Sequence, residues 1–93
     1  MNTIVKKQVS LLDGTFSTIE AREVLLTLVD DKIRFHSNRI FSQQERLGIT
    51  PQDSVTRIKQ LKRTREEILN IISECKERDC KIIIKSDINI EIL

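Results

Sequence analysis

IEAREVLLTLVDDKIRFHSNRIFSQQERL, residues 19–47, carries apolar side chains at the alternating three- and four-residue spacing of a helix with one packed face. IKQLKRTREEILNIISECKERD, residues 58–79, repeats that spacing. Folding the chain at Gly48-Ile49-Thr50 brings the two apolar seams together, with paired positions that add to 101. The sequence therefore predicts an antiparallel helical hairpin, because a heptad seam faces the same partner along its whole length.

This register makes specific contacts testable. It sets apolar side chains opposite one another along the seam and places one cation opposite one carboxylate near the open end. The expected pairs are Ile40 with Leu61, Ile33 with Ile68, Val29 with Ile72, and Arg22 with Asp79.

Capping residues set the expected helix limits. Ser17-Thr18-Ile19-Glu20 matches the capping box, and Gly48 supplies a left-handed C-terminal residue, so the first helix is predicted over 18–47. Phe16, just before the cap, is expected to pack against Ala21. Thr50 is predicted as the N-cap of the second helix, with Pro51 at its first position, and that helix is expected over 51–78.

Both ends of the chain show strand signals. Residues 3–12 contain β-branched side chains and end at the turn signal Asp13-Gly14, while residues 81–92 alternate isoleucine with polar side chains around a kink at Ser86-Asp87. Both strands leave the open end of the hairpin, so they are expected to pair. The predicted fold is α+β, mainly α: one domain, residues 1–93, with a long coiled-coil-like helical hairpin and a small terminal sheet. Alternation in the C-terminal strand predicts that Ile88, Ile90 and Ile92 bury against the helices and that Asn89 and Glu91 face water.

Composition narrows the class of protein. The chain has 93 residues, and its longest aliphatic runs are three residues, which predicts neither a signal peptide nor a membrane span. A cytoplasmic location is expected, with Cys75 and Cys80 as free thiols. Two cysteines five apart and one distant histidine do not make a zinc site, and no cofactor is expected.

A second apolar stripe lies beside the seam of the first helix, formed by Ala21, Leu25, Leu28 and Phe35. A single facing helix cannot cover both the seam and this stripe. The stripe either buries against the terminal strands of the same chain or forms the interface of a homodimer, with two hairpins making a four-helix bundle. We expect the dimer, because a lone hairpin would expose an apolar patch that monomers rarely tolerate.

Charge is distributed unevenly along the chain. Residues 32–65 carry a net charge of +7 and the remaining residues carry −5. Solvated helix faces explain such a pattern most simply. Two other interpretations remain open: a nucleic-acid or anion contact, or charge complementarity between hairpins in an assembly. The candidate anion-binding residues are Arg57, Lys59, Lys62 and Arg63.

His36 and Arg65 form a polar layer near the middle of the predicted seam, where polar residues usually fix register and partner choice. No nucleophile shares the helix face of His36, and no pair of carboxylates is placed for acid–base chemistry, so no enzyme is expected. The predicted function is a non-enzymatic, self-associating interaction or scaffold protein. The alternative is a small nucleic-acid-binding or regulatory protein that uses the basic half of the hairpin. Another protein could also add a strand at an open sheet edge.

Overall fold

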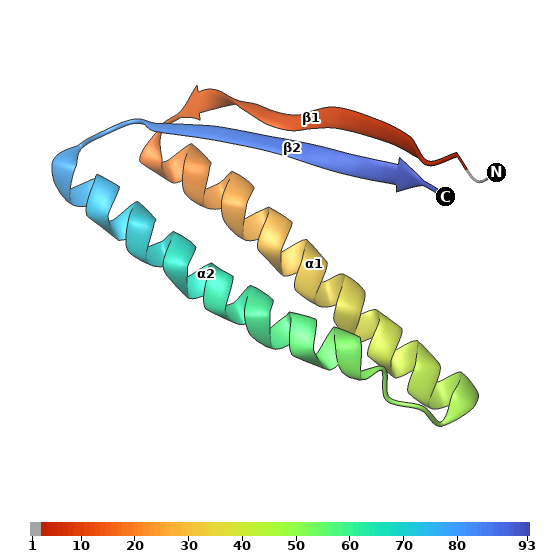
Figure 1. Cartoon of the computed structure of the whole chain (residues 1–93). Helices are drawn as coiled ribbons and strands as arrows, with labels where there is room; N and C mark the ends of the chain where they lie inside the picture. Colours follow the sequence, from red (N-terminus) through yellow and green to blue (C-terminus); the bar gives the residue numbers. More distant parts are fainter. Residues whose placement is uncertain (1–2) are drawn as a thin grey trace.

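The computed structural model describes residues 3–93, in the order β1 (Val5–Phe16), α1 (Thr18–Leu47), α2 (Gln52–Arg78) and β2 (Ile82–Ile92). The two helices form an antiparallel hairpin, and the two strands pair into an antiparallel ribbon beside it (Figure 1). The ribbon starts at the open end of the hairpin and diverges from the helices toward the end of the ribbon that carries the two chain termini (Figure 1). The predicted fold class, α+β and mainly α, is confirmed.

The predicted ends of α1 are confirmed. The Ser17 hydroxyl accepts a hydrogen bond from the backbone N–H of Glu20, and the Glu20 carboxylate accepts one from the backbone N–H of Ser17. At the other end Gly48 has a φ of 64°, a left-handed conformation that glycine adopts without the steric cost of a Cβ atom. Phe16 packs against the buried cluster that contains Ala21, as predicted from its position just before the helix cap.

The predicted N-cap of α2 is wrong by one residue. Pro51 occupies the cap position in an extended conformation, and no side chain caps the helix. The Thr50 hydroxyl instead accepts a hydrogen bond from the Gln44 side-chain amide at 3.0 Å. This contact joins the loop to the last turns of α1, and Thr50 lies one residue before the cap position of α2.

The predicted register of the hairpin is also wrong, by about one heptad. Inter-helix contacts join His36 to Ser54 and Thr18 to Cys75, whose numbers add to 90 and 93 rather than 101. Asp30 pairs with Arg65, and Ala21 shares a buried cluster with Ile72. Among the ion pairs of residues 3–93, Arg22 with Asp79 does not occur; Asp79 instead ends α2 with a φ of 53°.

The shift of α2 along α1, relative to the predicted register, has a physical reason. A heptad pattern fixes which face of a helix is apolar, but moving one helix by seven residues replaces one apolar layer with another. The observed register is accommodated by the loop, because residues 49–51 run back alongside α1 before α2 begins (Figure 1). Buried Pro51 and Ser54 then lie beside α1 rather than beyond its end. The last turns of α1 therefore extend past the start of α2.

β1 extends four residues beyond its predicted end at residue 12, whereas β2 matches its predicted range to within one residue. β1 continues through Asp13-Gly14 to Phe16, because those residues pair with Lys85 and Ile84 instead of turning. The ladder runs from Val5 opposite Ile92 to Phe16 opposite Ile82. Its one irregularity lies between Ser10 and Leu12, opposite the Ser86-Asp87 pair where the sequence predicted a kink.

The core lies where the base of the ribbon covers the open end of the hairpin. Ala21, Ile72 and Ile84 are its buried centre, one from each of α1, α2 and β2. Half-buried apolar side chains surround this centre: Leu12, Phe16, Leu25, Ile68 and Ile82. Three elements distant in sequence therefore depend on one another for burial.

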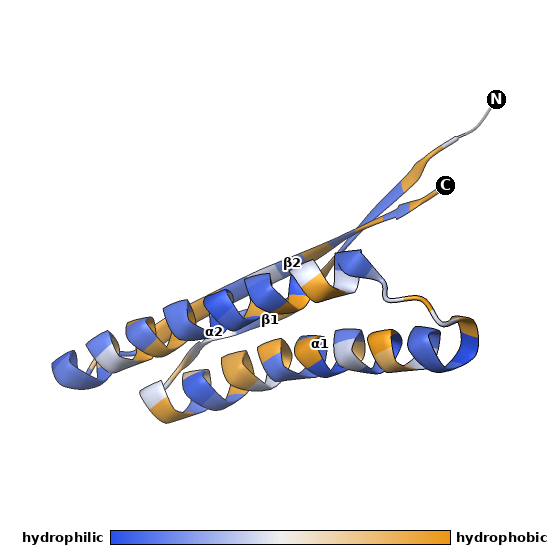
Figure 2. Cartoon of the chain, turned by 90° about the horizontal axis from the view of Figure 1, so that it is seen from below, coloured by the Kyte–Doolittle hydropathy of each residue, from blue (hydrophilic) through white to orange (hydrophobic). Residues whose placement is uncertain are grey.

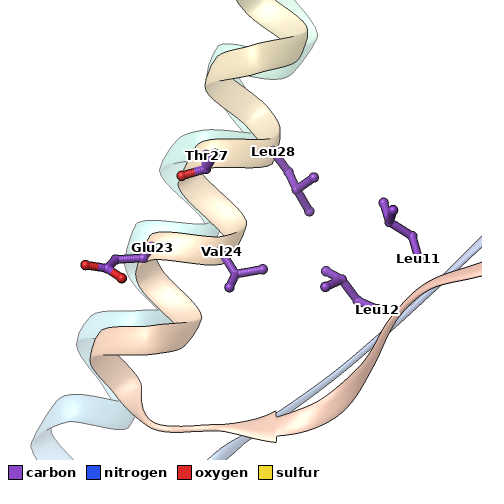
Figure 3. A pocket seen from close by; sticks show the side chains of 6 residues that line it. All are labelled: Leu11, Leu12, Glu23, Val24, Thr27 and Leu28. Carbon is purple, nitrogen blue, oxygen red and sulfur yellow. The ribbon is translucent and has the colours of Figure 1, made fainter.

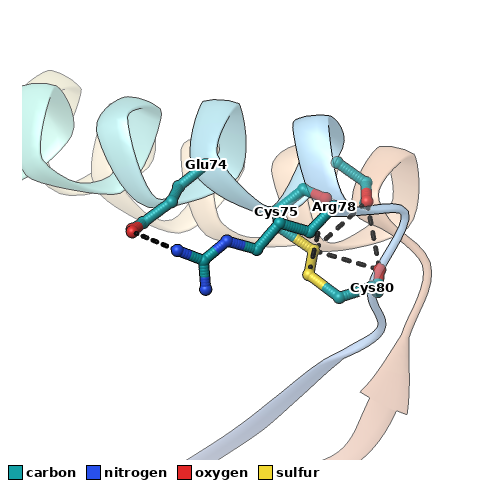
Figure 4. The surroundings of a disulfide bond; sticks show 5 residues. Glu74, Cys75, Arg78 and Cys80 are labelled. Atoms are coloured by element: carbon teal, nitrogen blue, oxygen red, sulfur yellow. Dashed lines mark hydrogen bonds and ion pairs between the residues drawn. A yellow bond between two sulfur atoms is a disulfide. The ribbon is translucent and has the colours of Figure 1, made fainter.

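Cys75 and Cys80 are joined as a disulfide at the junction of α2 and β2 (Figure 4), so the prediction of two free thiols is wrong. The Thr18 hydroxyl donates a hydrogen bond to the carbonyl oxygen of Cys80 at 3.4 Å, which ties the start of α1 to this junction. Arg78 pairs with Glu74 on the exposed side of the same turn.

Candidate functional surface

The ribbon has one apolar face, and the helices cover only its base. Along β2 the exposed fraction rises from 9% at Ile84 to 38% at Ile88, 44% at Ile90 and 53% at Ile92. Both views show the ribbon diverging from the helices toward its tip (Figures 1 and 2). The prediction that Ile88, Ile90 and Ile92 bury against helices of the same chain is therefore not met. We call their exposed surface, together with Val5 and Val9, the ribbon face.

The bulge in β1 keeps Val9 and Leu12 on the side of the ribbon that carries Ile88, a side on which Lys7, opposite Ile90, is the charged residue. Val9 pairs with Ile88 and Leu12 pairs with Ser86, so β1 contains one residue more than β2 between these two pairs. Side chains alternate along a strand, and Ser86 and Ile88 therefore share a side. Val9 and Leu12 follow their partners onto that side, although three positions separate them. Leu11 is the additional residue.

An apolar groove lies between β1 and the outer side of α1. Leu11 and Leu12 form one wall, and Val24 and Leu28 form the other, with their side chains directed toward one another (Figure 3). Glu23 and Thr27 complete its lining. The groove has a volume of about 360 Å³. We call it the α1 groove.

A second hollow adjoins the α1 groove and shares Leu28 with it. Asp31, Lys32 and Phe35 form the rest of its lining, and its volume is about 300 Å³. Phe35 is 60% exposed, a large fraction for a phenylalanine in the middle of a helix. An apolar knob therefore stands beside an apolar groove on one side of α1.

The structure divides the predicted interface stripe into two parts. Ala21 is fully buried and Leu25 packs against the same cluster, so the base of the ribbon covers this part. Ala21 is therefore removed from the predicted interface. Leu28 is half-buried and Phe35 is exposed, and both remain at the surface. Leu11 and Leu12 lay within the predicted strand and Val24 within the predicted helix, but the sequence did not indicate that this part of the strand packs beside α1.

The predicted polar layer is divided as well. The Nδ1 atom of His36 lies 3.0 Å from the Ser54 hydroxyl, while Arg65 donates to Asp30 at 3.0 Å. Arg39 donates to Ser54 at 2.7 Å and to Asp53 at 2.8 Å. The fully buried Ser54 is therefore the centre of the polar contact that joins α1 to the start of α2. The sequence identified His36 as a polar seam residue, but the predicted register placed it opposite Arg65 instead of Ser54.

Arg39 also affects the ionisation of Asp53 at this polar contact. The hydrogen bond from Arg39 holds the pKa of the Asp53 carboxyl below its usual value. Within residues 3–93, no group of three or more His, Cys, Asp or Glu side chains is placed to hold a metal ion. The polar contacts described above hold the two helices together.

The basic residues suggested for anion binding lie exposed on the first half of α2: Arg57, Lys59, Lys62 and Arg63. Arg57 donates to Gln60 at 3.1 Å. The ion pairs formed within the described part of the chain include none of the four. Their positive charge therefore faces solvent near the turn of the hairpin.

No family model, no curated protein and no solved structure matches this chain. Neither α1 nor α2 contains a stretch that is both long and apolar enough to cross a membrane. The function is therefore inferred from the ribbon face, the α1 groove and the charge distribution.

Proposed function

We propose that this protein is a non-enzymatic interaction module that associates with itself. The observation that carries the proposal is the ribbon face, whose isoleucines become more exposed from Ile84 to Ile92 on a side of the ribbon that is apolar except for Lys7 and Ser86. Alternating polar residues on the other side show that the apolar side is suited to a packed surface. The helices of the same chain supply that surface only at the base.

Physical constraints on a thin molecule support the proposal. The molecule measures 49 × 36 × 15 Å, so its thinnest dimension leaves little interior. A two-stranded ribbon is marginally stable in water unless another element packs against it. Contiguous apolar patches of several hundred Å² on a protein surface usually mark an interaction site. A second copy of the chain can supply the missing cover without any other component.

Sedimentation equilibrium over roughly 1–100 µM tests this proposal. The expected result is a mass that rises above the 10.8 kDa of one chain. A mass that stays at 10.8 kDa over the whole range contradicts self-association. Ile90→Lys should weaken the assembly if the ribbon face takes part, because it places a charge in an apolar contact. Asn89→Lys, on the polar side of the same strand, is the matched control.

The exposed basic residues of α2 favour a second candidate, the binding of a polyanion such as a nucleic acid. The supporting observation is that these side chains form no ion pair within residues 3–93. Binding of this kind weakens steeply as salt is added, because phosphate neutralisation releases counterions. Titration of a labelled oligonucleotide at several salt concentrations tests it. Binding that is absent at low salt, or unchanged by Lys59→Glu with Lys62→Glu, contradicts this candidate.

A further inference from the structure

We infer that a second copy of the chain packs antiparallel along α1, with Phe35 of each copy seated at the α1 groove of the other. The inference rests on the proposed self-association and adds its geometry. A knob and a groove lie on the same side of one helix, and they are arranged so that a two-fold rotation brings each to the other.

The first step concerns the spacing of knob and groove. Leu28 and Phe35 are seven residues apart, almost two full turns, so they lie on one side of α1. Leu28 forms part of both the α1 groove and the adjoining hollow, which Phe35 borders. The two hollows therefore adjoin each other along the helix at Leu28. An aromatic side chain arriving from another helix has an apolar place to enter beside Leu28, Leu11 and Leu12.

The second step is symmetry. A two-fold contact is self-complementary: if one residue meets another across the interface, the reverse contact also occurs. An antiparallel pair of α1 helices centred between Asp31 and Lys32 places Leu28 opposite the partner's Phe35, and Phe35 opposite the partner's Leu28. The same centre places Asp31 opposite the partner's Lys32. This point lies close to the middle of α1, so both helices overlap along almost their full length.

The third step is charge. Residues 18–31 of α1 carry a net charge of −3, and residues 32–47 carry +3. Antiparallel packing places the negative half of each helix against the positive half of the other, whereas parallel packing places like charges together. Ion pairs inside the chain engage Asp30 and Asp31 in the negative half and Arg34 and Arg39 in the positive half. Two charges are engaged on each side, so the halves still differ in sign.

The second helix extends this contrast. The half of the hairpin near the turn includes residues 52–65 of α2, which carry +4, and the open half includes residues 66–78, which carry −2. Each half of α2 therefore has the same sign as the half of α1 beside it. A second copy turned end for end is complementary along the whole hairpin, and this favours it over an unrelated partner.

Two phenylalanines on α1 allow a matched test by sedimentation equilibrium. Phe35→Glu introduces a charge at the proposed contact, while Phe41→Glu does so at a residue of similar exposure, 65%, on a different side of the same helix. The expected result is at least about a tenfold rise in the dimer dissociation constant for Phe35→Glu and about twofold or less for Phe41→Glu, as for a buried aromatic anchor and an exposed residue. Both sites are exposed in one chain, and circular dichroism verifies that each variant folds.

Cross-linking tests the symmetry independently. The described chain holds no free cysteine, so Asp31→Cys supplies a single thiol beside the proposed two-fold axis. A short bis-maleimide should join two such chains covalently. Ser42→Cys is the control, because antiparallel packing separates its two copies by roughly 30 Å along the helix at 1.5 Å per residue. Equal cross-linking of both variants indicates parallel packing and overturns the inference.

The outcomes separate this inference from the proposed function. A native chain that stays at 10.8 kDa overturns both. A native dimer that Phe35→Glu and Phe41→Glu weaken equally, or that neither weakens, overturns the geometry and leaves self-association standing. A native dimer that only Phe35→Glu weakens, and that Asp31→Cys alone cross-links, supports both.

Discussion

The Nδ1 atom of His36 and the Oγ atom of Ser54 lie 3.0 Å apart, and this contact joins the second half of α1 to the first turn of α2. Ser54 is fully buried and also receives a hydrogen bond from Arg39. The two contacts are specific to one register of the hairpin, because sliding a helix by seven residues would leave the buried hydroxyl without either partner. A small polar site therefore selects among apolar alignments of similar quality.

Ser54→Ala should destabilise the protein by about 0.5–1.5 kcal/mol, because it removes the buried hydroxyl that hydrogen-bonds to the half-buried side chains of His36 and Arg39. Urea denaturation followed by circular dichroism measures the change. Ser73→Ala, at an exposed position on α2, serves as the control. Equal effects of the two substitutions would show that Ser54 does not hold the register.

Ile72→Ala should cost about 2–4 kcal/mol, since Ile72 is 5% exposed and lies in the cluster with Ala21 and Ile84. Its chain neighbour Ile71 is 55% exposed, so Ile71→Ala should cost well under about 1 kcal/mol. The same denaturation experiment compares the two. A larger effect at Ile71 would place the other face of α2 in the core.

Ser17→Ala should destabilise α1 by about 0.5–2 kcal/mol, because the hydroxyl caps the backbone N–H of Glu20. Thr50→Ala should have a smaller effect, because Thr50 bonds to the Gln44 side chain and does not cap α2. Thermal melting of both variants measures the difference. A larger loss at Thr50 would restore that residue as the helix cap.

Acid should weaken the same cap. Hydrogen bonds from the backbone and side chain of Ser17 hold the pKa of Glu20 below its usual value. The unfolded chain therefore binds more protons in the interval between the two pKa values, and stability increases with pH there. The contribution is complete above about pH 4.3, the usual glutamate value, and is lost as the pH falls through the lowered pKa. Stability measured from pH 3 to 6 should show a smaller acid loss in Glu20→Gln than in the native chain.

The limits of α1 could be predicted from the sequence because caps are local: Ser17 and Glu20 lie three residues apart, and Gly48 bonds to backbone carbonyls four and five residues before it. The register could not, because the apolar seam repeats every seven residues and the decision depends on where buried Ser54 finds partners. The length of β1 was underestimated for a related reason. Asp13-Gly14 favours a turn locally, but pairing with Lys85 and Ile84 overrides that preference.

The candidate surface was predicted in part. Helical spacing identified Leu28 and Phe35 as a stripe outside the seam, but it also included Ala21, which the base of the ribbon covers. The groove itself could not be anticipated, since its other wall is formed by Leu11 and Leu12 of a strand whose position depends on tertiary packing. The spacing of apolar residues along one helix identifies an apolar face, but it does not indicate which other element of the fold packs beside that face.

The pairing of Val5 with Ile92 has a kinetic consequence. These residues lie near opposite ends of the chain, so closing the ribbon first would pay the entropy of a loop that includes both helices. Once the hairpin has formed, it carries the two strands to the same end and shortens the remaining search. The ladder should therefore close from Phe16 and Ile82 outward, and its far end should be the first part to open. Amide hydrogen exchange should be fastest at Val5 and Ile92 and slow progressively toward Ile84, where the helices begin to shield the strands.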